Sequence, residues 1–139
     1  MDSAKTSMVP TVVVVDDSAT AVSLYRMSAA GLHVDLHTFQ SADTAIEFLG
    51  GHQPDLLFLD IVMPEKDGLT MLKELRALPF HRETPVIMVT SKDYHQDRAI
   101  AKALGAIEFI LKPLSSREIR ELICRHTGAE DKGHSTASQ

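Results

Sequence analysis

Cysteine is almost absent from this chain of 139 residues, and tryptophan is missing altogether. The single cysteine, Cys124, has no second thiol in the chain to pair with, so no intrachain disulfide can form. This excludes the class of small secreted domains that disulfides hold together, and it gives no sign of an oxidising compartment. A lone cysteine within helix-like sequence is best explained as a packing residue.

Long apolar runs and clusters of positive charge are also lacking. No apolar run approaches the roughly 20 residues that a membrane-spanning helix needs. The first five residues lack the basic start and apolar stretch of a secretory signal, so we expect a cytoplasmic protein without membrane insertion. The net charge of −5, with no local Lys/Arg cluster, argues against direct binding to nucleic acid.

What is present fits one globular domain. The apolar fraction of 44% and the charged fraction of 24% are ordinary for such a domain, and the length is sufficient to bury a core. We expect a flexible N-terminal tail over residues 1–10 and a flexible C-terminal tail over 127–139, where nothing larger than alanine is available for burial. The domain would then span residues 11–126.

Five strand-like segments follow one another along this domain. The runs at 12–15, 56–59 and 86–89 are continuously apolar, which is typical of parallel strands that helices cover on both faces. The segments around 34–36 and 107–111 alternate partly between apolar and polar residues, which favours sheet edges. Three central strands and two edge strands predict one five-stranded sheet.

Helix-like segments lie between and after these strands. They are predicted at 19–30, 42–49 and 68–78, then at about 93–104 and from 116 onward. Candidate N-terminal caps precede or open them: Ser18, Ser41, Asp67, Asp93 with Gln96, and Ser115 with Glu118. We also expect Gly68 to adopt an unusual backbone angle. The alternation predicts a three-layer α/β fold with right-handed crossovers.

Polar residues follow four of the apolar strands directly. Asp16 and Asp17 follow the first, Asp60 the third, Thr90 ends the fourth, and Lys112 follows the fifth. In a parallel sheet these ends share one edge, where such folds build their binding sites. Each close pair of carboxylates costs about 4 kcal/mol at ~4 Å with an effective dielectric constant near 20. The oxygen-only donor set therefore predicts Mg²⁺, and Lys112 with Thr90 predicts a phosphoryl group beside it.

With these residues at its strand ends, the sequence resembles the receiver domain of response regulators, in particular the chemotaxis-type (CheY-like) single-domain regulators. The resemblance covers residues 11–126 and rests on five motifs in order: Val-Val-Asp-Asp-Ser (14–18), Leu-Asp-Ile-Val-Met-Pro-Glu-Lys-Asp-Gly (59–68), Val-Thr-Ser-Lys-Asp (89–93), Gly-Ala (105–106) and Phe-Ile-Leu-Lys-Pro (109–113). It implies a flavodoxin-like (βα)5 fold with strand order 2-1-3-4-5 and helices on both faces of the sheet.

The resemblance also implies the chemistry of the strand ends. Asp60 would accept a phosphoryl group from a sensor histidine kinase or a phosphotransfer protein. Mg²⁺ would be held by Asp17, Asp60 and the backbone carbonyl of Val62, with Asp16 acting mainly through water. Lys112 would pair with a phosphoryl oxygen. The protein would be a phosphoacceptor with intrinsic autodephosphorylation rather than a conventional enzyme.

Two further residues would carry the conformational switch of this family. Thr90 would bond to the phosphoryl group in the active state, and the ring of Phe109, at the aromatic switch position, would move into the vacated space. The surface of the fourth helix, fifth strand and fifth helix would then change and control a downstream protein. The Lys112–Pro113 peptide bond would be cis, as is typical of the family.

Other functions remain open at this stage. A phosphohydrolase of the haloacid-dehalogenase type would need an Asp-x-Asp motif after the first strand, which Asp16-Asp17-Ser18 does not match. A phosphorylation-independent adaptor would keep the fold without the chemistry, but the intact set of site residues argues against it. The chain could also be a receiver module from a larger regulator, whose output domain lies elsewhere.

Overall fold

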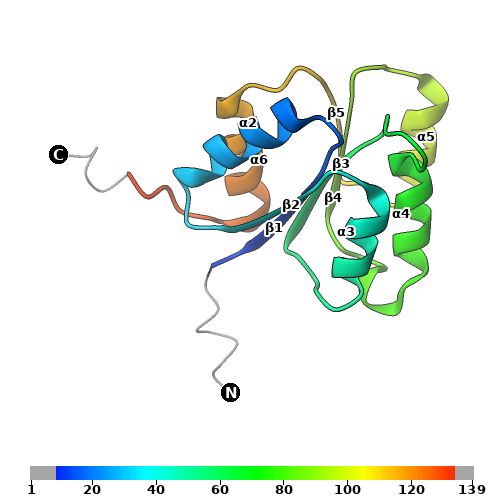
Figure 1. Ribbon diagram of the computed structural model, residues 1–139, viewed down its shortest axis with the longest axis horizontal. Coiled ribbons are helices and arrows are strands. Elements are labelled where there is room, and N and C mark those ends of the chain that lie inside the picture. The colour runs from blue at the N-terminus through cyan, green and yellow to red at the C-terminus, as the bar shows by residue number, and fades with distance from the viewer. Residues whose placement is uncertain (1–8, 134–139) are drawn as a thin grey trace.

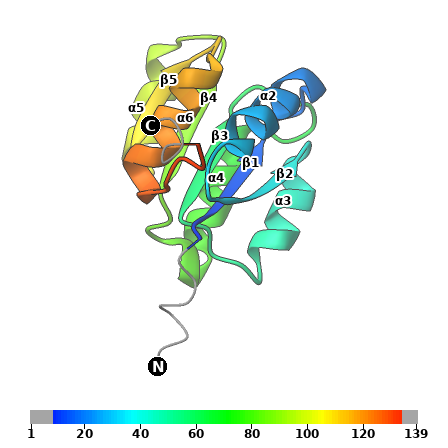
Figure 2. The same ribbon diagram turned by 90° about the vertical axis from the view of Figure 1, so that its left-hand side faces the viewer.

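Five parallel strands form the centre of the molecule. The computed structural model describes residues 9–133, and the remaining parts of the two expected tails lie outside the described residues. The strands are β1 (Thr11–Val15), β2 (Asp35–Phe39), β3 (Leu56–Asp60), β4 (Val86–Thr90) and β5 (Glu108–Leu111). Their order is β2-β1-β3-β4-β5, and every neighbouring pair is parallel, as Figure 2 shows from one edge to the other. This confirms the predicted topology.

Helices cover both faces of the sheet. Figure 1 shows α2 and α6 on one face and α3, α4 and α5 on the other. Their bounds are α2 (Ala19–Ala30), α3 (Ala42–Leu49), α4 (Gly68–Ala77), α5 (His95–Ala103) and α6 (Ser116–Thr127), with a short 3-10 turn, η1 (Pro79–His81), after α4. The three-layer fold with five helices is therefore confirmed. Within residues 9–133, no helix is long and apolar enough to span a membrane.

Burial along the strands explains the sequence pattern. Every residue of β3 and β4 is buried, which accounts for their continuously apolar sequence. The edge strands β2 and β5 contain only intermediate and exposed residues, as their alternating pattern predicted. The second strand lies slightly later than its apolar residues indicated, because its pairing with β1 runs from Asp35 opposite Thr11 to Phe39 opposite Val15.

Two hydrophobic clusters occupy the two faces of the sheet. Val13 and Val15 point into the cluster beneath α3, α4 and α5, whereas Val12 and Val14 point into the cluster beneath α2 and α6. Because side chains alternate along a strand, Asp60 follows Leu56 and Phe58 toward the side of α2 and α6. The alternation thus decides on which side of the sheet the acidic residue lies.

Most of the predicted helix caps are confirmed. Ser18, Ser41 and Asp67 each accept a hydrogen bond from the backbone of the first turn, and Ser115 forms a complete capping box with Glu118. The cap predicted at Asp93 is wrong, because α5 begins at His95 and its N-cap residue, Tyr94, makes no side-chain cap. The carboxylate of Asp93 instead accepts a hydrogen bond from Arg98 at 2.9 Å.

The segment after α6 packs against the domain. The backbone N–H of His33 donates to the carbonyl of Glu130 at 2.8 Å, and that of Lys132 donates to Gly31 at 2.8 Å. Leu32 and Asp131 form an isolated antiparallel bridge. The sequence assigned residues 128–133 to a flexible tail, but backbone hydrogen bonds attach this segment to the loop after α2.

Gly68 lies close to the backbone of Asp60, but the reason differs from the one we predicted. The residue with positive φ in this loop is Glu65, at 71°, and not Gly68. A Cβ atom on Gly68 would lie 2.1 Å from the carbonyl oxygen of Asp60, and the N–H of Gly68 donates to Ile61 at 2.9 Å. Only glycine allows the start of α4 to approach the end of β3 so closely.

We expect Gly68→Ala to lower the free energy of unfolding by about 2 kcal/mol or more, because the added methyl group overlaps with backbone that cannot rotate away. Urea denaturation of the two proteins measures this difference. Gly51→Ala is the matched control, because nothing lies within 4 Å of a Cβ at that position. Equal effects of the two substitutions would contradict the close approach at Gly68.

Candidate functional site

Asp16 and Asp17 stand where β1 ends and α2 begins. The N–H of Asp16 donates to the carbonyl of Phe39 on the edge strand at 3.0 Å, so the backbone of Asp16 is still held by the sheet. Its Oδ1 accepts a hydrogen bond from the N–H of Ser18 at 2.9 Å, which orients the carboxylate at the start of the helix. Asp16 is 1% exposed, whereas Asp17 is exposed to solvent.

Asp60, Thr90 and Lys112 come from the three strands on the other side of β1. Asp60 is the last residue of β3 and is 4% exposed; Thr90 is the last residue of β4 and is fully buried. The N–H of Lys112 donates to the carbonyl of Thr90 at 2.8 Å, which fixes the lysine backbone directly after β5. The predicted cis peptide bond joins Lys112 to Pro113.

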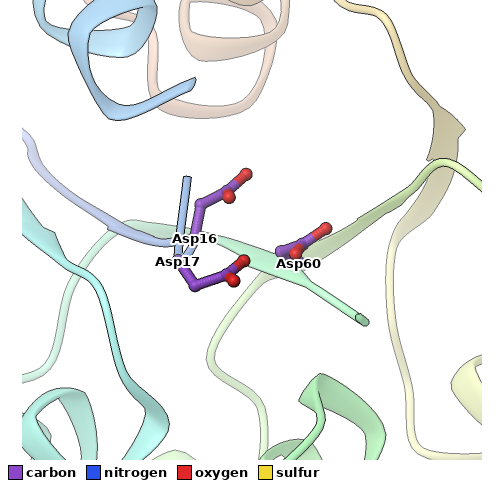
Figure 3. Close-up of side chains that lie close together, drawn as sticks. All are labelled: Asp16, Asp17 and Asp60. Carbon is purple, nitrogen blue, oxygen red and sulfur yellow. The ribbon is translucent and has the colours of Figure 1, made fainter. Parts of the chain in front are cut away.

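The three carboxylates share one small space. One oxygen atom from each of Asp16, Asp17 and Asp60 lies within 4.8 Å of the others, and Figure 3 shows the carboxyl groups directed toward a common region. The ammonium of Lys112 lies 2.8 Å from Oδ2 of Asp16 and 3.3 Å from Oδ1 of Asp60. The sequence prediction that these distant positions converge is borne out by this geometry.

The crowding of charge changes the acidity of the cluster. Burial raises the pKa of the Asp60 carboxyl to about 6, the charges of Asp16 and Asp17 add to this rise, and Lys112 opposes it. For Lys112 itself, burial disfavours the charged form, but hydrogen bonds and charge interactions with Asp16 and Asp60 outweigh burial and raise its pKa. One lysine therefore only partly offsets three carboxylates.

The donor set fits a hard divalent cation. All three side chains offer carboxylate oxygens, and no histidine or cysteine belongs to the cluster, which is the preference of Mg²⁺ or Mn²⁺ rather than Zn²⁺. A divalent ion would relieve the repulsion that raises the pKa of Asp60. The exposed Asp17 leaves one side of the cluster open to solvent. The carbonyl of Val62 remains a predicted additional ligand.

The two predicted switch residues lie on neighbouring strands, two register positions apart. Thr90 lies at the end of β4, and its Oγ1 accepts a hydrogen bond from the N–H of Lys92 at 3.2 Å. Phe109 lies within β5, opposite Met88 in the register, and packs against the cluster beneath α3, α4 and α5. The guanidinium of Arg98 lies over the Phe109 ring, 4.5 Å from its centre.

Two residues near the site were missed by sequence reasoning. Arg98 covers Phe109 and also binds Asp93, but nothing in its position on a polar helix indicated either contact. Tyr25 is 3% exposed, and its ring contacts that of Phe58 in a tilted arrangement with ring centres 5.1 Å apart. Burial raises the pKa of Tyr25, and the charges of Asp16 and Asp60 add to the rise. The sequence offered one signal for Tyr25, namely an aromatic residue with a hydroxyl group on the helix face that packs on the sheet.

Comparison with known families now gives the class of the protein. The family model of the response regulator receiver domain matches residues 12–124. The chain belongs to this family, the receiver domains of two-component response regulators. In general, members of this family are phosphoacceptors rather than conventional enzymes.

Solved structures share the fold across nearly their whole length. A CheY-like response regulator receiver domain protein from Methanospirillum hungatei is 18% identical with a TM-score of 0.79, covering 86% of this chain and 94% of its own. The phosphorylated cyanobacterial regulator RcpA is 19% identical (TM-score 0.76, coverage 85% and 94%). The Mn²⁺-bound regulator Rcp1 is also 19% identical (TM-score 0.73, coverage 83% and 92%). These likenesses establish the fold.

The raised pKa of Asp60 makes the stability of the metal-free protein depend on pH. The folded state keeps the proton on Asp60 up to about pH 6, whereas the unfolded chain releases it near its ordinary value of 3.8. Ionising Asp60 therefore costs stability as the pH rises from about 4 through 6. We expect metal-free Asp60→Asn to be about 2 kcal/mol more stable than the native protein at pH 7 and equally stable at pH 4.

Urea denaturation in the presence of a chelator measures both differences. Asp97→Asn, on α5 and outside the cluster, serves as the control. A stability difference for Asp60→Asn that is the same at both pH values would contradict the electrostatic origin of the shift.

Proposed function

We propose that this receiver domain accepts a phosphoryl group on Asp60, with Mg²⁺ held beside it by Asp16, Asp17, Asp60 and the carbonyl of Val62. The phosphoryl donor is a phosphohistidine on a sensor kinase or a phosphotransfer protein. The observation that carries the proposal is the meeting of three carboxylates within 4.8 Å, with the Lys112 ammonium 3.3 Å from Asp60. Membership of the receiver family supports it, and relatives of the same fold are described as phosphorylated and as Mn²⁺-bound.

The residues of the chain divide the chemistry among them. An Asp60 oxygen attacks phosphorus in line with the departing donor nitrogen, and Lys112 stabilises a phosphoryl oxygen as charge develops. A bound Mg²⁺ supplies further neutralisation of the phosphoryl oxygens. Because Asp60 is buried and Asp17 is exposed, the donor approaches from the open side at Asp17. The acyl phosphate that forms is open to hydrolysis, so the signal limits itself.

Signal output is proposed to run through the loop after β4. When the Thr90 hydroxyl turns to a phosphoryl oxygen, its hydrogen bond with the N–H of Lys92 has to change. The next residue, Asp93, binds Arg98, and Arg98 covers the ring of Phe109. Movement at Thr90 is thereby passed to the surface of α5, β5 and α6, where a downstream protein would bind.

The second candidate function is a phosphorylation-independent adaptor. Labelling of Asp60 with a phosphoryl group distinguishes the proposed phosphoacceptor from this adaptor. We expect incubation with Mg²⁺ and acetyl phosphate to add one phosphoryl group, which peptide mass spectrometry maps to Asp60. The other buried carboxylate of the cluster, Asp16, has both oxygens engaged, because Oδ1 accepts from the N–H of Ser18 and Oδ2 binds the Lys112 ammonium at 2.8 Å. Asp60→Asn should abolish the labelling, and chelation of the metal should reduce it by at least about 100-fold.

Asp97→Asn is the matched control and should be labelled like the native protein, since this carboxylate lies on α5 away from the cluster. Retention of the label in Asp60→Asn would refute the assignment of the acceptor. A protein that binds a partner equally well with and without the label would instead be the adaptor.

Arg98 favours the observed position of the Phe109 ring, and this effect on the proposed switch can be tested. The cation–π contact stabilises the observed position of the Phe109 ring by about 0.5–1 kcal/mol, as is typical at exposed sites. We expect Arg98→Gln to raise the population of the alternative ring position about two- to fivefold in the unphosphorylated protein. NMR spectra of labelled phenylalanine, compared with spectra in Mg²⁺ and beryllium trifluoride, measure this population.

Arg117→Gln is the control for the Arg98 variant, because Arg117 is largely exposed on α6 and pairs only with Glu121 among the described residues. Identical Phe109 spectra in native protein and in Arg98→Gln would show that the guanidinium does not hold the ring.

A further inference from the structure

The loop between β3 and α4, residues 61–67, carries the carbonyl of Val62, the one proposed metal ligand that is not a side chain. This carbonyl accepts no hydrogen bond from any residue of the described range 9–133, so its oxygen is available to a cation. A backbone carbonyl cannot be turned by rotating a side chain. Its direction is set by the conformation of the loop, and contacts that hold the loop therefore affect the metal site.

The first half of this loop is held by the sheet and the core. The N–H of Ile61 donates to the carbonyl of Val89 on β4 at 3.0 Å, and the carbonyl of Ile61 accepts from the N–H of Gly68 at 2.9 Å. Met63 is 8% exposed and packs into the cluster beneath α3, α4 and α5. These contacts fix the residues on both sides of Val62 but not the rest of the loop.

The tip of the loop is a strained turn. Glu65 has a φ of 71°, and the N–H of Lys66 donates to the carbonyl of Pro64 at 2.7 Å, which defines a γ-turn with positive φ at its central residue. Such a turn is rare and persists only where the surrounding structure holds it. Pro64 and Glu65 are both exposed, so buried packing of these two side chains cannot hold the turn.

Lys66, the last residue of the turn, is bound to two helices. Its Nζ lies 2.7 Å from Oε1 of Glu74 on α4 and 3.2 Å from Oδ1 of Asp43 in the first turn of α3. The two helices lie side by side (Figure 1). Hydrogen bonds with Glu74 and Asp43 raise the pKa of the Lys66 ammonium, so it stays charged. None of these three residues belongs to the acidic cluster at the strand ends.

We propose that Lys66 is a positioning residue for the metal site, whose ion pairs with Asp43 and Glu74 hold the β3–α4 loop in the conformation in which the Val62 carbonyl binds the cation. The inference rests on the proposed function and adds to it a residue that sets the affinity for the metal. Without these ion pairs the strained turn relaxes, and the carbonyl of Val62 loses its fixed direction. The metal then binds more weakly.

The sign of the effect separates positioning from simple electrostatics. Removing the positive charge of Lys66 makes the protein more negative, and by Coulomb attraction alone this change would strengthen the binding of a cation. Loss of the positioning contacts has the opposite effect. A weaker affinity for the metal after the loss of Lys66 is therefore explained by the position of the loop and not by the change in charge.

The test is a titration of the intact chain with Mn²⁺, followed by the electron paramagnetic resonance signal of free Mn²⁺. We expect Lys66→Met to bind Mn²⁺ about three- to tenfold more weakly than the native protein, because exposed ion pairs are individually weak but residues that orient metal ligands act strongly on affinity. The Mg²⁺ concentration for half-maximal labelling of Asp60 should rise by a similar factor. Lys66→Arg keeps the charge and should recover most of the affinity.

Two further comparisons serve as controls. Lys73→Met removes the same charge from an exposed position of α4 that has no ion pair among the described residues, and it should not weaken Mn²⁺ binding. In a chain that already carries Asp43→Asn and Glu74→Gln, Lys66→Met should add little further loss, because the partners through which Lys66 acts are gone.

Each outcome bears on a different claim. Mn²⁺ binding by Lys66→Met that is as tight as in the native protein, or an equal loss in Lys73→Met, would overturn the role of Lys66 while the proposed function stands. A full further loss from Lys66→Met in the chain without both carboxylates would also overturn it. A native protein that binds Mn²⁺ no more tightly than Asp60→Asn would overturn the proposed metal site and this inference together.

Discussion

Electrostatic repulsion among Asp16, Asp17 and Asp60 is the constraint on which the rest of this structure depends. Three carboxylates within 4.8 Å destabilise a metal-free site, and the Lys112 ammonium offsets only part of their charge. Burial raises the pKa of Asp60 to about 6, and this imbalance of charge adds to the rise. Such a site gains stability from a bound cation, because the positive charge offsets the repulsion. The same repulsion that costs stability therefore provides the binding energy.

The scaffold maintains this arrangement through backbone contacts rather than through flexible side chains. The sheet holds Asp16 through Phe39 and holds Lys112 through Thr90, in both cases by backbone hydrogen bonds. Gly68 allows the start of α4 to lie directly against the carbonyl of Asp60. Rigid strands surrounded by two packed clusters keep the buried carboxylates of Asp16 and Asp60 close together, whereas Asp17 faces solvent. A site built at strand ends is thus preorganised for its chemistry.

The two sides of the site have different surroundings. Toward α2 and α6, the side chain of Lys112 borders an apolar groove that Tyr25 also lines. Toward α5, Thr90 connects through Lys92, Asp93 and Arg98 to the ring of Phe109. A small change in the position of the Thr90 hydroxyl can therefore reach the surface of α5 without disturbing the side of the site that faces α2 and α6.

The sequence by itself determined the strands, their central or edge positions and the five charged or hydroxyl residues at their ends. This is possible because burial on one or both faces restricts which residue types occur along a strand or a helix, and that restriction is visible as a pattern of apolar residues. It did not determine contacts between elements: Asp93 was interpreted as a helix cap but binds Arg98, and Gly68 was assigned a special φ although its close approach to Asp60 is what requires glycine. No local pattern in the sequence indicated that Arg98 lies over Phe109, and the aromatic residue at position 25 did not by itself indicate that it lies near Asp16 and Asp60. Such pairings depend on which helices the strand order brings together, and only the tertiary structure decides that.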